Sequence, residues 1–370
     1  MNHGWEIRPL QDICNKASSN LMQKNIDSEN GKYPVFGASG IAGYIDYYVQ
    51  AKDYIGIIKD GSGVGRVSVY PKESSLLGTL QYIIPNENMD LRYVAYALKS
   101  MNLAKFVSGA AIPHIYFRDY GKEKIAVPSI KTQSKVADEL DKLNELIEIK
   151  RNQIKDLDAL AQSLFYETFG DPIAPPKGWN TKVWSDLFDT ILGKMLDKNK
   201  QIETDIQLPY LANQNVQWGY FDLSKLNTMS FTQNEVAKFR LKEGDILICE
   251  GGESGRCAIW KGADYTILFQ KAIHRARIKD RNIINPYFVR FWLEIFKKND
   301  GLKNHLTKAT IEHLTGAKLK TVNVPVPPIA LQEQFAERIE AIEAQKKRVE
   351  ASIADLEMLL ASRMDYWFND

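Results

Sequence analysis

The chain has 370 residues, a formal net charge of +2 and 44% hydrophobic residues. This length allows two globular domains with additional helices, and this composition excludes a largely disordered protein. No run of about 18 apolar residues occurs and the polar N-terminus lacks a signal core, so we expect a cytoplasmic protein without a membrane segment. Three irregularly spaced cysteines predict reduced thiols rather than disulfides or a zinc site.

The small net charge conceals an uneven distribution along the chain. Basic residues exceed acidic residues by 8 in residues 1–128 and 171–328 taken together, whereas acidic residues exceed basic ones by 6 in the remaining two segments. This distribution is expected when globular parts contact a polyanion and the helices between them do not. Chance would account for the excess of 2 in the first globular segment, so the excess of 6 in the second carries the argument.

Residues 1–130 are predicted to form a first globular domain of the α+β class. A β-type run at Tyr54–Ile58 precedes a glycine-rich turn over residues 60–66, and residues 93–98 have the apolar pattern of a helix. Glycines in such a turn let the backbone approach a partner closely. The candidate phosphate-binding side chains of this domain are Lys32, Lys59 and Arg66.

Residues 131–170 are predicted to form one long helix with a narrow apolar stripe. Proline at position 128 precedes the helix, and Gly170-Asp171-Pro172 ends it. Apolar residues recur at alternating steps of four and three, interrupted by Lys150, which is the pattern of a coiled coil. The stripe consists of Val136, Leu140, Leu143, Ile147, Ile154, Leu157, Ala161 and Leu164.

Residues 171–329 are predicted to form a second globular domain of the same class. Here a β-type run at 245–249 precedes a glycine-rich turn at 250–256, and Asn285-Pro286 is expected to begin a helix. Residues 271–281 place basic side chains at every second position, so as a strand they would show one wholly basic face. The candidate phosphate-binding or base-reading residues are Lys194, Gln214, Asn215, Arg256, Arg275, Arg277 and Lys279.

Residues 330–370 are predicted to form a second long helix with the same kind of stripe, interrupted by Lys346. Two stripes of equal length in one chain can cover each other, which predicts an antiparallel coiled coil. The globular domains would then lie at different ends of a rod of about 54 Å and be related by pseudo-twofold symmetry. Two separate helices, each packed on its own domain, are the alternative.

The two halves of the sequence repeat each other, which supports this plan of domain, helix, domain, helix. Many identical residues superpose at a shift of 199, and the two glycine turns superpose at a shift of 190. At the shift of 199, Ile112, His114, Val127, Pro128, Ile130, Gln133, Ala137, Ser163, Phe169 and Asp171 match Ile311, His313, Val326, Pro327, Ile329, Gln332, Ala336, Ser362, Phe368 and Asp370.

Motifs for catalysis or cofactor binding are incomplete in this sequence. Neither glycine turn has the spacing of a phosphate-binding loop or of a dinucleotide fingerprint. The Asn285-Pro286-Tyr287-Phe288 segment resembles an amino-methyltransferase motif but lacks its second proline and a cofactor strand. The histidines are not spaced as metal ligands, so we expect no cofactor and no metal in this chain.

The whole chain resembles the specificity subunits of type I restriction-modification systems. Five segments carry the resemblance through their order and duplication around the two helices, although residues 128–133 lack the second proline and the Glu-Gln pair found at 327–334. These segments are Gly31–Gly37, Gly61-Ser62-Gly63, Leu208–Leu211, Gly244–Leu247 and Val326–Ile329 with Gln332-Glu333-Gln334.

This resemblance implies a non-catalytic subunit that recognises a bipartite, asymmetric site on double-stranded DNA. It implies that residues 1–130 and 171–329 are target-recognition domains and that the helices at 131–170 and 330–370 fix the gap between half-sites. Two methyltransferase subunits would dock on the chain, and restriction would require motor-nuclease subunits. S-adenosylmethionine, ATP and magnesium would bind to those partners.

Two other classes of function stay open at this point. One is a coiled-coil assembly adaptor whose globular ends bind proteins, which salt-sensitive binding to duplex DNA would distinguish from a DNA-reading subunit. The other is a stand-alone nuclease or methyltransferase, which the incomplete motifs disfavour.

Overall fold

The computed structural model describes residues 4–26, 30–109, 112–174, 178–195, 206–262, 266–307 and 312–369. The chain divides into two compact units: unit 1 is Met1–Asn152 with Val349–Asp370, and unit 2 is Gln153–Arg348. Each unit therefore contains one β-rich globular part and a portion of each long helix. The compact units thus differ from the four consecutive segments of the sequence, whose division into recognition domains stays a prediction.

The globular part of unit 1 is built on a four-stranded sheet of order β2-β8-β5-β6, a three-stranded sheet of order β4-β3-β7 and the pair β1-β9. Its strands are β1 (Glu6–Pro9), β2 (Cys14–Ser18), β3 (Tyr33–Gly37), β4 (Gly40–Ile45), β5 (Tyr54–Ile58), β6 (Val67–Tyr70), β7 (Ser75–Leu76), β8 (Leu80–Pro85) and β9 (Lys124–Val127). Its helices are α1 (Leu10–Ile13), α2 (Leu91–Ser100) and α3 (Phe117–Tyr120), with 3-10 turns η1 (Gln23–Asn25) and η2 (Leu103–Phe106).

The globular part of unit 2 has sheets of order β11-β17-β14-β15 and β13-β12-β16 and the pair β10-β18. Its strands are β10 (Asn180–Val183), β11 (Phe188–Leu192), β12 (Ile206–Leu211), β13 (Asn227–Phe231), β14 (Ile246–Cys249), β15 (Cys257–Ile259), β16 (Leu268–Phe269), β17 (Ile273–Ile278) and β18 (Asn323–Val326). Its helices are α5 (Trp184–Leu187), α6 (Gln233–Phe239), α7 (Pro286–Lys298) and α8 (Gly316–Lys320), with η3 (Asn213–Asn215) and η4 (Lys303–His305).

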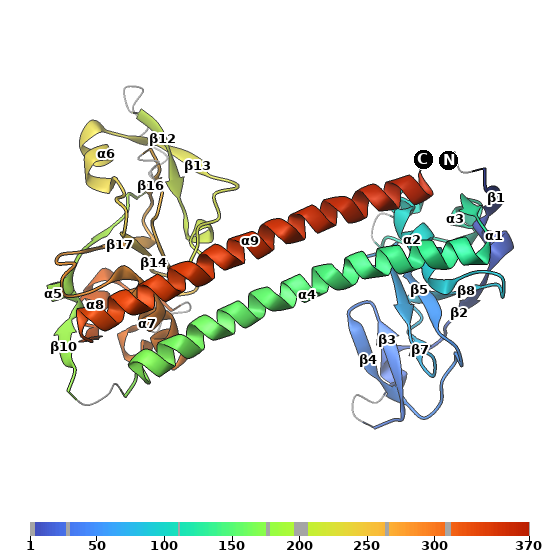
Figure 1. The fold of residues 1–370 in the computed structure, drawn as a ribbon, viewed down its shortest axis with the longest axis horizontal. Coiled ribbons are helices and arrows are strands. Elements are labelled where there is room, and N and C mark those ends of the chain that lie inside the picture. Colours follow the sequence, from blue (N-terminus) through green and yellow to red (C-terminus); the bar gives the residue numbers. More distant parts are fainter. Residues whose placement is uncertain are drawn as a thin grey trace. The chain divides into compact units, whose positions relative to one another are not determined.

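The two globular parts share one topology, which confirms the α+β class and the internal repeat. In both three-stranded sheets the central strand, β3 or β12, pairs antiparallel with one neighbour and parallel with the other. In both units a helix, α2 or α7, packs its apolar face on the four-stranded sheet (Figure 1). As predicted, α7 starts at Pro286, and the Asn285 side chain caps it by accepting a hydrogen bond from Tyr287 N at 2.9 Å.

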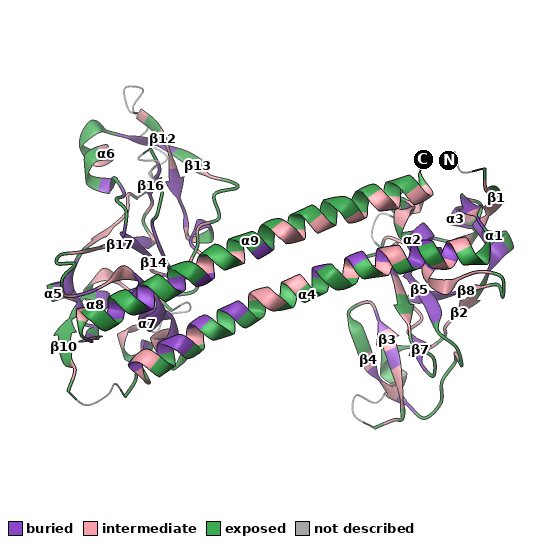
Figure 2. Ribbon diagram, viewed as in Figure 1, coloured by how far each residue is buried: buried purple, intermediate pink, exposed green. Residues whose placement is uncertain are grey.

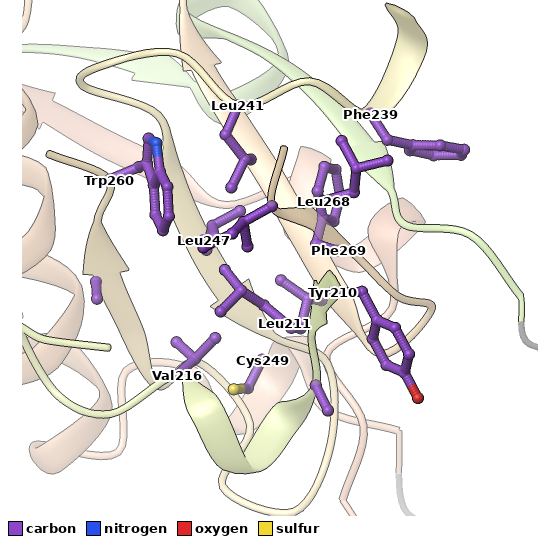
Figure 3. Packing of buried hydrophobic residues seen from close by; sticks show 14 of the residues in the cluster. Tyr210, Leu211, Val216, Phe239, Leu241, Leu247, Cys249, Trp260, Leu268 and Phe269 are labelled. Carbon is purple, nitrogen blue, oxygen red and sulfur yellow. The ribbon is translucent and has the colours of Figure 1, made fainter. Parts of the chain in front are cut away.

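One hydrophobic core of unit 2 lies between its two larger sheets. It combines Leu247 and Cys249 of β14 with aromatic residues such as Trp260 and Phe269, all nearly inaccessible to solvent (Figure 3). The three cysteines of the chain are buried and free, and burial raises the pKa of Cys249 to about 11. These thiols are therefore packing groups of the core rather than reactive thiolates.

The two long helices are α4 (Ile130–Phe169) and α9 (Ile329–Phe368). A glycine with φ of 73°, Gly170, follows α4 and ends it. In unit 1, Glu139 binds Arg363, and Arg151 binds Glu357 at 2.8 Å. In unit 2, Lys346 Nζ lies 2.5 Å from Asp158, so the lysine that interrupts the stripe is paired. The helix portions run antiparallel within each unit, which confirms the predicted helix pair (Figure 1).

The stripes are buried unevenly along this pair. Val136, Leu140 and Ile147 of α4 are buried, whereas Ile353 and Leu356 of α9 are half-buried (Figure 2). Within unit 1 the stripe of α4 is therefore more deeply buried than the stripe of α9.

Aromatic side chains at the end of each long helix complete the core of a globular part. In unit 2, Phe169 packs against Phe288 and Phe335 with ring centroids 4.8 and 5.1 Å apart. In unit 1, the corresponding residue Phe368 packs against Tyr93 at 5.2 Å. Each globular part is thus finished by the helix that follows the other globular part in the sequence.

Replacing Phe169, which is 2% exposed, with alanine is expected to leave a cavity in unit 2. We expect Phe169→Ala to lower the free energy of unfolding by about 3–5 kcal/mol. Leu160→Ala, at a residue of the same helix that is 53% exposed, is the control and should change it by about 0.5 kcal/mol or less. Urea unfolding followed by circular dichroism measures both, and equal losses would contradict the packing.

Candidate nucleic-acid interface

Each unit has a junction where loops from its two larger sheets meet. We define the unit 2 junction as Lys194, the loop 212–217, the glycine turn 250–256 and the loop 270–272. Backbone hydrogen bonds connect these segments, from Glu250 N to Ala272 O at 2.8 Å and from Lys271 N to Lys194 O at 2.6 Å. The Arg256 guanidinium adds a bond to the carbonyl of Asn213 at 2.9 Å.

The unit 1 junction is built in the same way from residues 38–39, Lys59 with the glycine turn 60–66, and the loop 77–79. Leu77 N donates to Phe36 O at 2.9 Å, and Lys59 N donates to Thr79 O at 2.9 Å. The Arg66 guanidinium donates to the carbonyl of Ala38. Gly61, Gly63 and Gly65 all have positive φ, so this turn requires glycine.

The two arginine contacts occur at equivalent positions of the repeat. Val35 faces Ser75 across β3 and β7, and Tyr210 faces Leu268 across β12 and β16. Three residues further along these central strands lie the two carbonyls that accept from the arginines. The turn arginine therefore joins the two sheets in both units.

The charges around the two arginines differ. Arg256 forms an ion pair with Glu253 at 3.2 Å, and Glu253 also accepts a hydrogen bond from Trp218 Nε1. At the shift of 190, Gly63 occupies the position of Glu253 in unit 1. Arg66 is exposed, and no carboxylate of the described residues forms an ion pair with it. Among the described residues, the junction arginine of unit 1 is therefore an uncompensated cation, whereas the junction arginine of unit 2 is paired with an acid.

The other predicted residues of the junctions are either ion-paired or exposed to solvent. Lys59 lies 2.9 Å from Asp60, and Lys194 Nζ lies 2.6 Å from Glu235. Gln214 is exposed on the loop after β12. Its amide is therefore accessible for hydrogen bonding to a base edge or to a phosphate.

Asn215 is buried, which gives it a structural role in the same loop. Its Oδ1 accepts from Ala212 N at 2.9 Å, and its Nδ2 donates to the carbonyls of Asp222 and Lys225 at 2.9 and 3.0 Å. This side chain uses its hydrogen-bonding capacity on the backbone, so it holds the loop that presents Gln214.

The predicted basic face of residues 271–281 is wrong as a solvent-exposed surface. The strand β17 ends at Ile278 and lies between β11 and β14, so it is a central strand. Arg275 is 4% exposed and lies 2.8 Å from Asp189, and burial lowers the pKa of its guanidinium. Arg277 binds Asp245 through two bonds of 2.7 Å, which raise the pKa of its guanidinium. These arginines neutralise acids of the same unit.

Two further candidates lie away from the junctions. Lys32 is exposed and precedes β3, whereas Arg66 contacts the residue that follows this strand. Lys279 follows β17 at the end opposite the unit 2 junction, and its Nζ donates to the carbonyl of Ser185 at 2.7 Å. The structure therefore groups Lys59 with Arg66, and it groups Lys194, Gln214 and the buried Asn215 with Arg256. The remaining candidates, Lys32, Arg275, Arg277 and Lys279, lie outside the junctions.

Sequence reasoning missed Glu253 and Trp218 as junction residues. The acid was visible inside the second glycine turn, where the first turn has glycine. Trp218 gave no such signal because its contact with Glu253 joins residues 35 positions apart.

No group of His, Cys, Asp and Glu within the described ranges could hold a metal ion. Among the same residues, no helix is long and apolar enough to cross a membrane. His274, on β17, is 1% exposed and bonds through Nε2 to the carbonyl of Leu314 at 2.9 Å. Burial lowers the pKa of this imidazole, so it is neutral and donates Nε2–H.

The depressed pKa of His274 predicts a pH-dependent stability. The unfolded chain binds a proton near pH 6.5, whereas the folded chain binds it only at lower pH. Stability should be full above pH 6.5 and fall as pH drops toward the folded pKa, by at most about 1.4 kcal/mol per pH unit. His274→Gln should reduce this slope in urea unfolding measured from pH 7 to pH 5. The same slope in the variant and the natural chain would contradict the assignment.

The repeated fold and its paired junctions define a two-part binding protein, and comparison with known proteins identifies the family. A family model described as the type I restriction modification DNA specificity domain matches residues 2–159 and 176–357. The chain belongs to this family. It is a DNA specificity subunit of a type I restriction-modification system and itself non-catalytic.

Individual relatives agree with this assignment. The chain is 23% identical to the type I restriction enzyme MjaVIII specificity subunit of Methanocaldococcus jannaschii, over 92% of this chain and 86% of that protein. It is 19% identical to the EcoKI specificity subunit of Escherichia coli, over 70% of this chain and 60% of that protein. The fold matches the crystal structure of the S subunit from M. genitalium with a TM-score of 0.63 at 16% identity, covering 100% of this chain and 97% of that one.

Proposed function

We propose that this chain recognises a bipartite, asymmetric site on double-stranded DNA, with one junction directed at each half-site. The observation that carries the proposal is the junction itself, which both units build on the same backbone but with different charges. Because the scaffold is repeated, each unit would recognise one half-site. Because the side chains differ between the units, the two half-sites would differ in sequence. The paired helices would hold the two units at a set spacing on the duplex.

Arg66 is the leading DNA contact within this proposal. Its guanidinium is exposed, is steadied by one bond to Ala38, and has no acidic partner among the described residues. Such a group binds a phosphate or the O6 and N7 atoms of guanine. Arg256 is held by Glu253 and Lys194 by Glu235, so unit 2 would rely more on Gln214 for the same task.

The long helices are the proposed docking surface for two methyltransferase subunits and for restriction subunits. Large apolar side chains remain exposed on them, among which are Leu146, Ile149 and Leu160 of α4 and Met358 and Leu359 of α9. Such residues suit a further helix-to-helix contact. S-adenosylmethionine, ATP and magnesium would be bound by these partners, and the complex would act in the cytoplasm. Family membership disfavours the alternative of an adaptor whose globular ends bind proteins.

Methylome sequencing tests the bipartite site. A host carrying this chain with its methyltransferase subunit should methylate adenines in a motif of two different short half-sites separated by unspecified bases. Deleting the gene for this chain should abolish that methylation. A single uninterrupted short motif would contradict the proposal.

Substitution of Arg66 tests the junction. Arg66→Ala should weaken binding of the chain and its methyltransferase to the target duplex by about tenfold or more, and should lower the salt slope by about one. Arg8→Ala, at an arginine on β1, is the control and should change neither value. Glu253→Gln should strengthen binding, because it removes a negative charge from the unit 2 junction. Equal effects of Arg66→Ala and Arg8→Ala would exclude Arg66 from the interface.

A further inference from the structure

A buried glutamine lies where the long helix of unit 1 meets the globular part. Gln133, in the first turn of α4, is 1% exposed. Its Oε1 accepts from Asp90 N at 2.9 Å, and its Nε2 donates to the carbonyl of Pro128 at 2.9 Å. Asp90 is the N-cap of α2, whose carboxylate accepts from Arg92 N and Tyr93 N. One amide therefore joins the starts of two helices.

Unit 2 repeats this arrangement with Gln332 in the first turn of α9, which is 0% exposed. Its Oε1 accepts from Asn285 N, the N-cap of α7, at 2.9 Å. Its Nε2 donates to the carbonyls of Pro327 and Ile283 at 2.8 and 3.1 Å. Both amide hydrogens are used, so the side chain is oriented by three bonds to fixed backbone.

Other polar contacts between the long helix and the globular part differ between the units. In unit 1, Arg92 binds Asp138 and Asp141 at 2.8 and 2.7 Å. In unit 2, Lys261 binds Glu343 instead. Gln133 and Gln332 thus form a polar link that both units make with the same residue type. Glutamine suits this position because its one planar amide both accepts and donates hydrogen bonds.

We infer that Gln133 and Gln332 are positioning residues that fix the direction in which each globular part projects from its long helix. This inference rests on the proposed bipartite site. A rotation of about 10° moves a point roughly 20 Å from its pivot by about 3.5 Å, which is close to the base-pair step of about 3.4 Å. The hydrogen bonds of each amide therefore set the spacer length that the subunit accepts, without either glutamine touching DNA.

The test compares spacer preference in the full chain assembled with its methyltransferase subunit. Duplexes carry the target found by methylome sequencing, with the natural spacer or with one base pair added or removed. Gln332→Met removes all three bonds at similar volume. We expect the ratio of methylation rates, natural over altered spacer, to fall by about three- to tenfold. Gln334→Met, at an exposed glutamine two residues away, is the matched control and should keep the ratio.

The outcomes separate positioning from general stability. A purely structural role would lower methylation of every duplex in proportion, leave the ratio unchanged and overturn the inference. If circular dichroism shows that Gln332→Met does not fold, Gln133→Met and Gln332→Glu decide by the same ratio, since Glu keeps the bond from Asn285 N but cannot donate to the two carbonyls. Absence of any split target in the natural complex would instead overturn the proposed function.

Discussion

Each globular part depends on a helix end that belongs to the other half of the sequence. Phe165 and Phe169 follow the first globular part but pack with Phe288 and Phe335 in unit 2. At the other end of the chain, Trp367 stacks on Trp5 in unit 1 at 5.8 Å. The contacts that bury these rings also fix the helix against the globular part. The same ring contacts therefore stabilise each globular part and fix its orientation on the helix.

The repeat preserves the backbone and varies the charges placed on it. Both junctions use an arginine to tie a glycine turn to the loop after the central strand, through Arg66 or Arg256. Within this frame an acid, Glu253, neutralises the arginine of unit 2. Because the arginine bonds to a backbone carbonyl, the frame tolerates different neighbouring side chains. Such a scaffold allows the charge of one junction to change without rebuilding the other.

Much of the fold follows from local sequence signals, but the side-chain partners do not. Helices α4 and α9, strand β5 and the start of α7 were predictable, because heptads, β-branched runs and an Asn-Pro start act over short distances. Burial of Asn215 and Arg275 was not, because it depends on strands brought together from distant positions. A period of two in charge predicts one face of a strand, but it does not reveal whether that strand is central.

The ion pairs of β17 limit which basic side chains can contact DNA, but they do not change the net charge that attracts the domain to DNA. Arg275 and Arg277 each pair with an acid of the same unit, so each pair removes one charge of each sign from the count. The excess of 6 basic residues in 171–328 therefore persists and must lie on other side chains. Lys225, Lys238 and Lys271 are exposed members of that set. The charge excess thus supports long-range attraction to a polyanion, whereas contact at each proposed half-site would depend on the few groups that the junctions expose.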